Sequence, residues 1–194
     1  MISAKYEIPV TSPGAILREE KRLGTPLGFE ADQLTANGQL LPDQTVNALV
    51  ETWLLTYHPA FVLDGYPRSI GQADALAVML ESHGSPLQIV ICLEADQSTI
   101  EQRVQKRLVC EGCGTIVSIG LHVSAEDTCP KCGGRLVKRA DDNLETLAFR
   151  MCEYRQKTEP LISYYRSRGL LHVVDSTRAP DVVQSEIVGL LEAA

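Results

Sequence analysis

Residues 61–76 read FVLDGYPRSIGQADAL and join three kinds of local structure. The segment opens with an apolar run that ends at Asp64, continues through Gly65 and Pro67, and closes with helical spacing. This order predicts a buried strand, a tight turn and a helix, as in parallel α/β sheets. Because ligands bind at the carboxyl ends of such strands, Asp64 and Arg68 are candidate site residues. The alternative is that these two side chains only pair with each other within the turn.

The same alternation of apolar strands and helices extends over the rest of the chain. The expected strands lie at 9–11, 61–64, 89–93 and 171–174. The expected helices lie at 15–23, 44–57 with Asp43 as N-cap, 72–83, 97–107, 144–168 with a break at Pro160, and 181–192. The sequence therefore predicts an α/β fold in which helices flank a parallel sheet.

Residues 110–138 interrupt this pattern with a segment that is rich in Gly and Cys and has no helical period. Two C-x2-C pairs lie 15 residues apart, within the range of zinc sites. The four cysteines are Cys110, Cys113, Cys129 and Cys132. Four thiolates leave no open position, so we expect a structural zinc that folds the insert; disulfides are the disfavoured alternative. The other two cysteines, Cys92 and Cys152, are expected in the core.

The composition favours a cytoplasmic protein that handles small anionic ligands. The 194 residues carry a formal net charge of −7, which disfavours general binding to nucleic acid. No apolar run reaches the roughly 18–20 residues that a membrane span needs, so no membrane partner is expected. The cations are 12 Arg and 6 Lys. Since the planar fork of Arg grips phosphate with two hydrogen bonds, this excess indicates phosphate ligands.

Several arginines flank the cysteine insert. Arg103 and Arg107 lie four residues apart in a predicted helix, so both guanidinium groups are expected on one face. Arg139 and Arg150 follow the insert and could each reach a phosphate from its edge. The acids at 141–142 could latch the segment in one conformation, or they could only favour a helix start through its dipole.

Taken together, these motifs resemble the adenylate kinase family over nearly the whole chain. Residues 61–76 resemble the AMP-binding segment of that family, and 107–114 with 129–146 resemble its zinc-bearing lid and the helix that follows. Further matches are Arg150, Tyr154, TEPLI at 158–162, Tyr164, Tyr165, PLG at 26–28, GQLLPD at 38–43 and VD at 174–175. The resemblance implies a P-loop-kinase-like fold. Its core would be 1–109 and 139–194, with an AMP-binding region at about 12–43 and a zinc-binding lid at 110–138.

The resemblance also implies an activity and a set of site residues. Adenylate kinases transfer the terminal phosphoryl group of ATP, which arrives with magnesium, to AMP, and so form two ADP. The residues implied at the AMP site are Gly14, Arg18, Leu40, Leu41, Gly65, Arg68 and Gln72, the last at the adenine edge. Arg103 and Arg107 are implied at ATP, and Asp64 beside magnesium. The implied catalytic cations, which stabilise the transferring phosphoryl group, are Arg68, Arg107, Arg139 and Arg150.

Two departures separate the sequence from the family pattern. None of the six lysines follows a Gly, so the 194 residues contain no G-x-x-x-x-G-K-[ST] loop, and the first strand of the family is expected to be absent. Residues 12–18 read SPGAILR where the family has S-T-G-D-x-L-R, so Pro13 and Ala15 replace a hydroxyl and a carboxylate.

Three hypotheses follow from these matches and departures. The chain is an adenylate kinase whose sequence lost its start, a non-catalytic AMP-binding relative, or an interaction module built on the cysteine insert. The arginines argue against the third, because a bare module would not need them. A monomer is expected unless a second chain completes the sheet.

Overall fold

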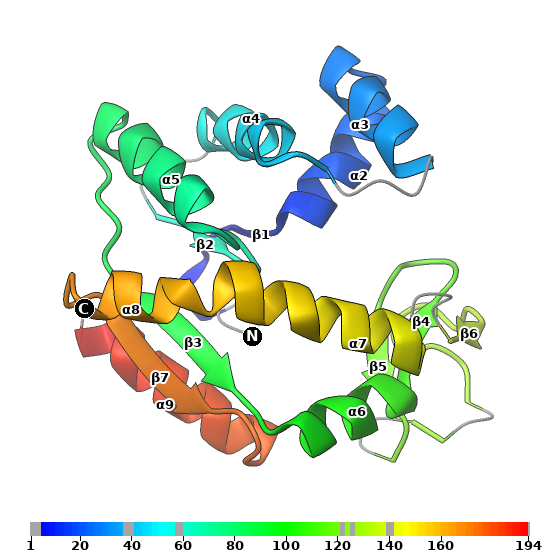
Figure 1. The fold of residues 1–194 in the computed structure, drawn as a ribbon. Helices are drawn as coiled ribbons and strands as arrows, with labels where there is room; N and C mark the ends of the chain where they lie inside the picture. Colours follow the sequence, from blue (N-terminus) through cyan, green and yellow to red (C-terminus); the bar gives the residue numbers. More distant parts are fainter. Residues whose placement is uncertain are drawn as a thin grey trace. The chain divides into compact units, whose positions relative to one another are not determined.

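Short strands alternate with helices through the residues that the computed structural model describes, which confirms the predicted α/β order (Figure 1). The described residues are 5–36, 41–56, 60–120, 123–124, 127–138 and 142–193. The chain divides into two units. Unit 1 comprises residues 1–90, 157–172 and 190–194, and unit 2 comprises residues 91–156 and 173–189.

The four predicted parallel strands are present and form two pairs. They are β1 (Val10–Thr11), β2 (Val62–Leu63), β3 (Val90–Glu94) and β7 (Leu171–Asp175). β1 and β2 are parallel, with Val10 opposite Val62. The second pair is β3 with β7, in which the Val90 amide donates to the Leu170 carbonyl at 2.9 Å and the Ser176 amide to the Glu94 carbonyl at 2.8 Å. Because the partner numbers rise together, β3 and β7 also run in the same direction.

The strands are less buried than the sequence predicts. Leu93 in β3 and Val173 in β7 are 55% and 41% exposed. Within the described residues β2 pairs only with β1, and β3 only with β7. A two-stranded sheet leaves its faces only partly covered, which explains the difference.

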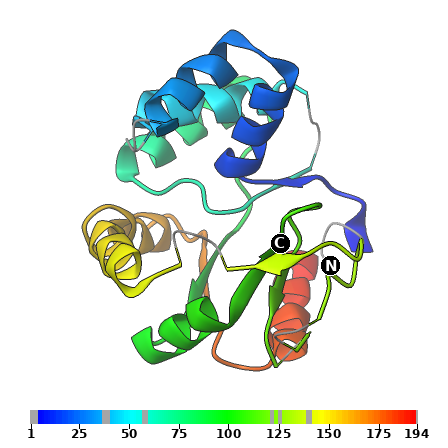
Figure 2. The ribbon, with the colours of Figure 1, turned by 90° about the vertical axis from the view of Figure 1, so that its right-hand side faces the viewer.

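Five helices are described in unit 1, and α2 to α5 lie together in both views of the ribbon (Figures 1 and 2). They are α2 (Pro13–Leu23), α3 (Pro26–Ala36), α4 (Asp43–Leu54), α5 (Ile70–Ser82) and α8 (Pro160–Arg166). α2 begins at Ser12, whose Oγ accepts a hydrogen bond from the Ala15 amide at 3.2 Å, and ends at Gly24 in the left-handed region with φ 66°. α3 was not predicted, because its apolar residues do not keep to one face.

A glycine sets how closely α3 approaches α2. A Cβ added at Gly28 would lie 2.5 Å from the carbonyl carbon of Glu20, which is backbone and cannot move aside cheaply. Gly28, which belongs to the PLG match at 26–28, thus has a packing role in this fold.

The core of unit 1 fixes the turn that follows β2. Its buried side chains come from α2, α4, α5 and that turn: Ile16, Leu49, Val50, Leu54, Tyr66, Leu76, Met79 and Leu80. The ring of Tyr66 is 6% exposed, and its hydroxyl donates to Oδ1 of Asn47 at 2.8 Å. Burial raises the pKa of this phenol well above its ordinary value, so it stays a neutral donor. The turn after β2, which carries the candidate site residues Asp64 and Arg68, is therefore anchored to α4.

Unit 2 contains the cysteine insert as a small antiparallel sheet. Its elements are α6 (Gln97–Lys106), β4 (Arg107–Cys110), β5 (Ile116–Ser118), β6 (Leu136–Val137) and α7 (Leu144–Glu153), with most of β3, of β7 and of α9 (Pro180–Ala193). β4 lies between β5 and β6, with Arg107 opposite Ser118 and Cys110 opposite Leu136. The insert thus forms short strands, in agreement with its lack of helical period.

The predicted break in the helix before Pro160 is confirmed, and it begins earlier than expected. After α7 the chain passes through a π-helical turn, Tyr154–Thr158, before α8 starts with Pro160. Proline lacks the amide that a continuing helix would use, so the hydrogen-bonding pattern changes ahead of it.

Two local predictions were wrong. The N-cap of α4 is Pro42, and Asp43 is the first helical residue and makes no capping bond. Cys152 is exposed, because the half-buried positions of α7 include Leu147 and Met151 on another part of its surface; Cys92 is half-buried.

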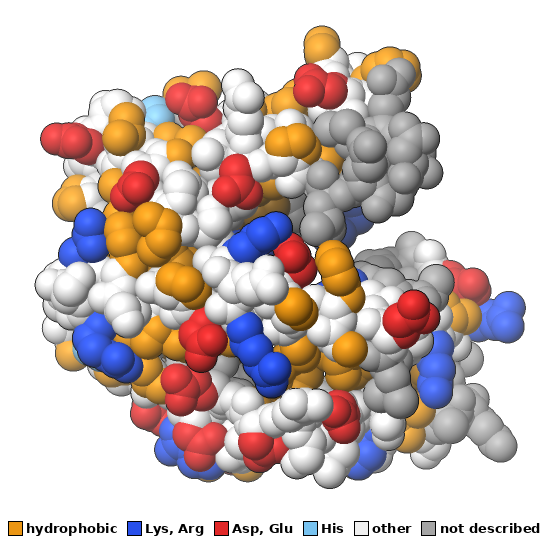
Figure 3. All heavy atoms as spheres, viewed as in Figure 1, with side chains coloured by type: hydrophobic (Ala, Val, Ile, Leu, Met, Phe, Trp, Pro, Cys, Tyr) orange, Lys and Arg blue, Asp and Glu red, His pale blue; other side chains and the backbone are white. Residues whose placement is uncertain are grey.

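The described surface carries both signs of charge. Acidic and basic side chains are interspersed over the face shown in Figure 3. Among the described helices, none combines the length and apolar character needed to cross a membrane.

Candidate functional site

The turn after β2 lies at the carboxyl end of that strand, as predicted. The amide of Asp64 donates to the Thr11 carbonyl at 2.7 Å, so the β1–β2 ladder ends there. Gly65 has φ 69°, and Arg68 folds back over it, with Nε donating to the Gly65 carbonyl at 2.8 Å. The positive φ favours glycine at this position, and a Cβ there would lie 3.0 Å from Nη2 of Arg68, so the guanidinium would have to move a little.

Asp64 and Arg68 do not form the ion pair that was the alternative to a ligand role. Both side chains are exposed, and within the part of the chain that the structure describes no ion pair joins them. The hydroxyl of Thr158 donates to the Arg68 carbonyl at 2.9 Å and holds the turn from the other side. Because the backbone of Arg68 is held in place and its guanidinium is exposed, this side chain is well placed to bind an anion that arrives from solvent.

A ring of hydrogen bonds links this turn to α4 and α5. The Asp43 carboxylate accepts from Oγ of Ser69 at 2.6 Å and from Nε2 of Gln72 at 2.7 Å. Oε1 of the Gln72 side chain accepts from the backbone amide of Arg68 at 2.7 Å, and Oγ of Ser69 accepts from the backbone amide of Gln72 at 3.2 Å. The Gln72 side chain is thereby held on both ends, in a residue that is only 5% exposed.

Asp43 is the site residue that sequence reasoning missed. Its place before a helical stretch suggested an N-cap. Its carboxylate instead contacts Ser69 and Gln72, which lie 26 and 29 positions further along the chain. No local pattern signals a contact of that range. Pro42 was the one local sign that the helix begins at Asp43 and that Asp43 is therefore not its cap, because a proline side chain has no group that caps a helix.

The remaining AMP-site candidates of unit 1 lie on α2 and before α4. Arg18 is exposed, and a Cβ at Gly14 would lie 3.6 Å from its Nη1, so the guanidinium lies over the start of α2. Leu41 is half-buried against the core. Leu40 lies outside the described residues.

The arginines of unit 2 are held by partners of their own. Arg103 donates to the carbonyl of Ser176 and, at 3.5 Å, to its hydroxyl. Arg107 donates through two nitrogens to both oxygens of Asp142, with Nε at 2.8 Å from Oδ2. The Asp142 side chain is 1% exposed, so this is a buried carboxylate in a bidentate pair.

The prediction that Arg103 and Arg107 share a helical face is wrong. α6 ends at Lys106, and Arg107 has an extended backbone with φ −76° and ψ 132°, because it begins β4. Arg150 lies exposed on α7, while Arg139 and Asp141 lie outside the described residues.

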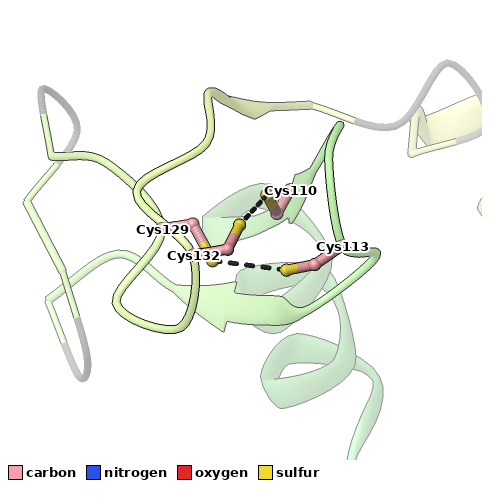
Figure 4. Close-up of side chains that lie close together, drawn as sticks. All are labelled: Cys110, Cys113, Cys129 and Cys132. Carbon is pink, nitrogen blue, oxygen red and sulfur yellow. Dashed lines mark hydrogen bonds between the residues drawn. The ribbon is translucent and has the colours of Figure 1, made fainter.

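The four cysteines of the insert converge as the sequence predicts (Figure 4). Their Sγ atoms all lie within 4.8 Å of one another, with Cys110 to Cys132 at 3.4 Å and Cys113 to Cys129 at 3.6 Å. These separations exceed the roughly 2 Å of a disulfide bond and are near the about 3.8 Å between thiolates on one tetrahedral ion with 2.3 Å bonds.

Two similar turns build the cluster. The Gly114 amide donates to the Cys110 carbonyl at 2.9 Å and the Gly133 amide to the Cys129 carbonyl at 2.8 Å, with φ of 70° and 71° at the two glycines. At Gly134 a Cβ would lie 2.9 Å from Sγ of Cys110 and 3.3 Å from that of Cys132. The backbone thus leaves room for four sulfur atoms around one point, and these residues could hold a metal ion.

The protonation of the cluster favours a cation. The side-chain hydrogen bond between Cys113 and Thr115, with help from the Thr115 backbone amide and Cys132, lowers the pKa of Cys113 to about 6. The amide of Gly134 favours the Cys132 thiolate, but the neighbouring Cys113 and Cys110 outweigh it and raise the pKa of Cys132 to about 12. Ionisation of one cysteine therefore disfavours ionisation of its neighbours unless a positive charge lies among them. A divalent metal ion supplies that charge.

Comparisons with known proteins bear on these sites. Residues 1–170 match the family described as Adenylate kinase. A protein named Adenylate kinase from Archaeoglobus fulgidus is 39% identical over 194 residues, which cover 98% of this chain and 89% of that protein. Another from Methanosarcina barkeri is 39% identical over 190 residues, with coverages of 96% and 88%. One from Thermodesulfovibrio yellowstonii is 38% identical over 191 residues, with coverages of 97% and 89%.

Proposed function

Because this chain belongs to the adenylate kinase family, we propose that it transfers the terminal phosphoryl group of magnesium-bound ATP to AMP and releases two ADP. The observation that carries the proposal is the similarity to proteins named Adenylate kinase over almost the entire chain. The geometry at the end of β2 supports it, because an exposed arginine and a held glutamine amide stand together there.

On the AMP side, Arg18 and Arg68 bind the phosphate, and their exposed guanidinium groups support this role. Gly65 leaves room for the Arg68 guanidinium beside the backbone, and Gly14 lies next to the Arg18 guanidinium at the start of α2. Leu40 and Leu41 line the pocket. Gln72 binds the edge of the base. Charge-assisted hydrogen bonds from arginine to phosphate are among the stronger polar contacts, so most of the AMP affinity comes from the two arginines.

On the ATP side, Arg103 lies against the adenine and Arg107, Arg139 and Arg150 approach the transferring phosphoryl group. Such a transition state spreads charge over the phosphoryl oxygens, which positioned cations stabilise without covalent chemistry. A phosphoryl group that reaches Arg107 shares this guanidinium with Asp142 or displaces that carboxylate. Asp64 holds a water of the magnesium that arrives with ATP.

The insert at 110–138 acts as a lid on a core of residues 1–109 and 139–194, and its metal is zinc. Zinc supplies the positive charge that lets four thiolates coexist, and it fixes the knuckles that carry β4 and β5. A closed tetrahedral site takes no part in phosphoryl transfer. A reducing, cytoplasmic setting and a monomeric chain fit these assignments.

One observation favours a second candidate, a relative that binds AMP without turnover. The 194 residues contain no G-x-x-x-x-G-K-[ST] loop, whose backbone amides and lysine hold ATP phosphates. This candidate keeps the AMP site and the zinc-bound insert.

The formation of ADP from ATP and AMP by the purified 194-residue chain separates the two candidates. Chromatography of the nucleotides should show ADP accumulating in proportion to enzyme, and Arg68→Ala should lower the rate at least about tenfold. The matched control is Arg22→Ala, which removes an exposed arginine one turn beyond Arg18. AMP binding without ADP formation would favour the second candidate, and loss of both would exclude both.

A further inference from the structure

The hydrogen-bond ring of Asp43, Arg68, Ser69 and Gln72 fixes which way the Gln72 amide faces. A carboxylate only accepts hydrogen bonds and a backbone amide only donates them. Nε2 of Gln72 must therefore face Asp43, at 2.7 Å, and Oε1 must face the Arg68 amide, also at 2.7 Å. A flipped amide would set oxygen against oxygen and hydrogen against hydrogen.

The ring is closed by Ser69, which keeps the Asp43 carboxylate in place. Oγ of Ser69 accepts a hydrogen bond from the backbone amide of Gln72 at 3.2 Å, which caps α5. The Ser69 hydroxyl donates its hydrogen to the Asp43 carboxylate at 2.6 Å. Each hydrogen bond in the ring thus has one fixed donor and one fixed acceptor. The three bonds that involve Gln72 are half-buried and the Ser69–Asp43 bond is exposed, so a reversed bond at Gln72 costs more than it would in water.

The fixed amide presents a defined pattern to a bound base. Nε2 has a second hydrogen and Oε1 a second lone pair beyond the bonds of the ring. Adenine offers the complement, because its N6 amino group donates and the ring nitrogens on either side accept. Hypoxanthine has the same shape but carries an oxygen at position 6, which accepts where adenine donates.

We propose that Asp43 determines base specificity by holding the Gln72 amide in the orientation that selects 6-amino over 6-oxo purine monophosphates. The inference rests on the proposed AMP site and adds the residue that gives it selectivity. Asp43 itself is a positioning residue, since its carboxylate acts through Gln72. A purely structural role at the start of α4 would change stability but would leave the ratio of affinities unaltered.

The test is calorimetric titration of the full chain with AMP and with IMP, the hypoxanthine nucleotide. The wild-type protein should bind AMP about 10- to 100-fold more tightly than IMP, the range of one good bidentate base contact. In Asp43→Asn the side chain can donate as well as accept, so either orientation of Gln72 finds a partner. The AMP/IMP ratio should fall about threefold and stay above unity, because the backbone amide of Arg68 still favours one orientation.

Asp181→Asn is the matched control, because it also removes a carboxylate from the first turn of a helix without touching Gln72. It should keep the wild-type ratio. Where Asp43→Asn melts below the assay temperature, Asp43→Ser carries the same test, since its hydroxyl donates and accepts.

The outcomes separate this inference from the function on which it rests. A wild-type chain that binds AMP and IMP equally, or a folded Asp43 variant with the wild-type ratio, would overturn the inference and leave the AMP site standing. A folded wild-type chain that binds neither nucleotide would overturn both.

Discussion

The Arg107–Asp142 pair joins the first residue of β4 to the residue before Asn143, the N-cap of α7. The cysteine insert lies between these two points of the chain, within unit 2. The carboxylate is 1% exposed and the Arg107 side chain 28% exposed, so the pair is largely desolvated. It fixes the base of the insert by connecting the chain before it to the chain after it.

Removal of the arginine should therefore destabilise the protein measurably. Arg107→Gln leaves Asp142 buried without its cation, which costs about 1–3 kcal/mol in the free energy of unfolding, less than for a fully buried pair. Urea denaturation followed by circular dichroism measures this loss. Arg107→Gln combined with Asp142→Asn should recover part of it. The exposed pair of Arg22 with Glu19 is the control, and Arg22→Gln should leave the urea midpoint unchanged. Equal midpoints for Arg107→Gln and wild type would contradict the burial argument.

Residue types with a local signature could be predicted from the sequence, and residues with distant partners could not. The cysteines, Gly65 and Arg68 carry their signature in spacing and in the strand–turn–helix order. Asp43 and Asp142 do not, since their partners lie 29 and 35 positions away. Only the fold shows that one orients a glutamine and the other holds an arginine.

At the scale of elements, α6 depends on a charged cap. Oδ1 of Asp96 accepts from Oγ of Ser98 and from the Thr99 amide, both at 2.7 Å. These bonds, that of Ser98 first, lower the pKa of Asp96 below its ordinary 3.8. A carboxyl whose pKa falls on folding adds stability above its unfolded pKa and loses it as the pH drops through the folded pKa.

The stabilising effect of this cap should thus depend on pH. The difference in melting temperature between wild type and Asp96→Ala should be full at neutral pH and shrink below about pH 3.8. Ser12→Ala removes the uncharged cap of α2 and should give a difference that does not vary with pH. Differential scanning calorimetry from pH 7 to pH 3 distinguishes them. A constant difference for Asp96→Ala would refute the electrostatic account of this cap.

The cysteine insert depends on the space at Gly134. Gly134→Ala would place a methyl group 2.9 Å from Sγ of Cys110, so the sulfur must shift and the tetrahedral arrangement opens. We expect a fall in metal content and in the affinity for zinc of about tenfold or more, measured by atomic absorption and by competition with a chelator. Gly112→Ala is the matched control, because its Cβ would meet both sulfur atoms at an ordinary 3.9 Å. Equal metal content in the two variants would show that the cluster is not shaped by this glycine.

Element boundaries show where sequence patterns stop being sufficient. The strands and the break before Pro160 follow from apolar runs and from the chemistry of proline. α3 escaped prediction because its apolar residues are spread around the helix. α6 was predicted one residue too long, because the helix-to-strand change at Arg107 is imposed by pairing with Ser118.

At the scale of the whole molecule, the family and the α/β class could be predicted from the sequence, but the sheet could not be described from it. The strand segments were expected in one sheet, whereas β1–β2 and β3–β7 are separate pairs in the described residues. Pairing is decided by partners far along the chain, and short apolar segments do not specify them. Arg68 and Gln72, by contrast, lie together at the end of β2 within unit 1, where the strand–turn–helix pattern predicts a site.

In the proposed function, the end of β2 binds the phosphate of AMP. Calorimetric titration of the 194-residue chain with AMP tests it most directly, with circular dichroism to verify the fold of each variant. We predict one AMP per chain and an affinity about 10- to 100-fold weaker in Arg68→Ala, as expected for the loss of one charge-assisted contact, with no change in Arg22→Ala. A folded wild-type chain that does not bind AMP, or an Arg68→Ala variant that binds it as tightly as wild type, would contradict the claim.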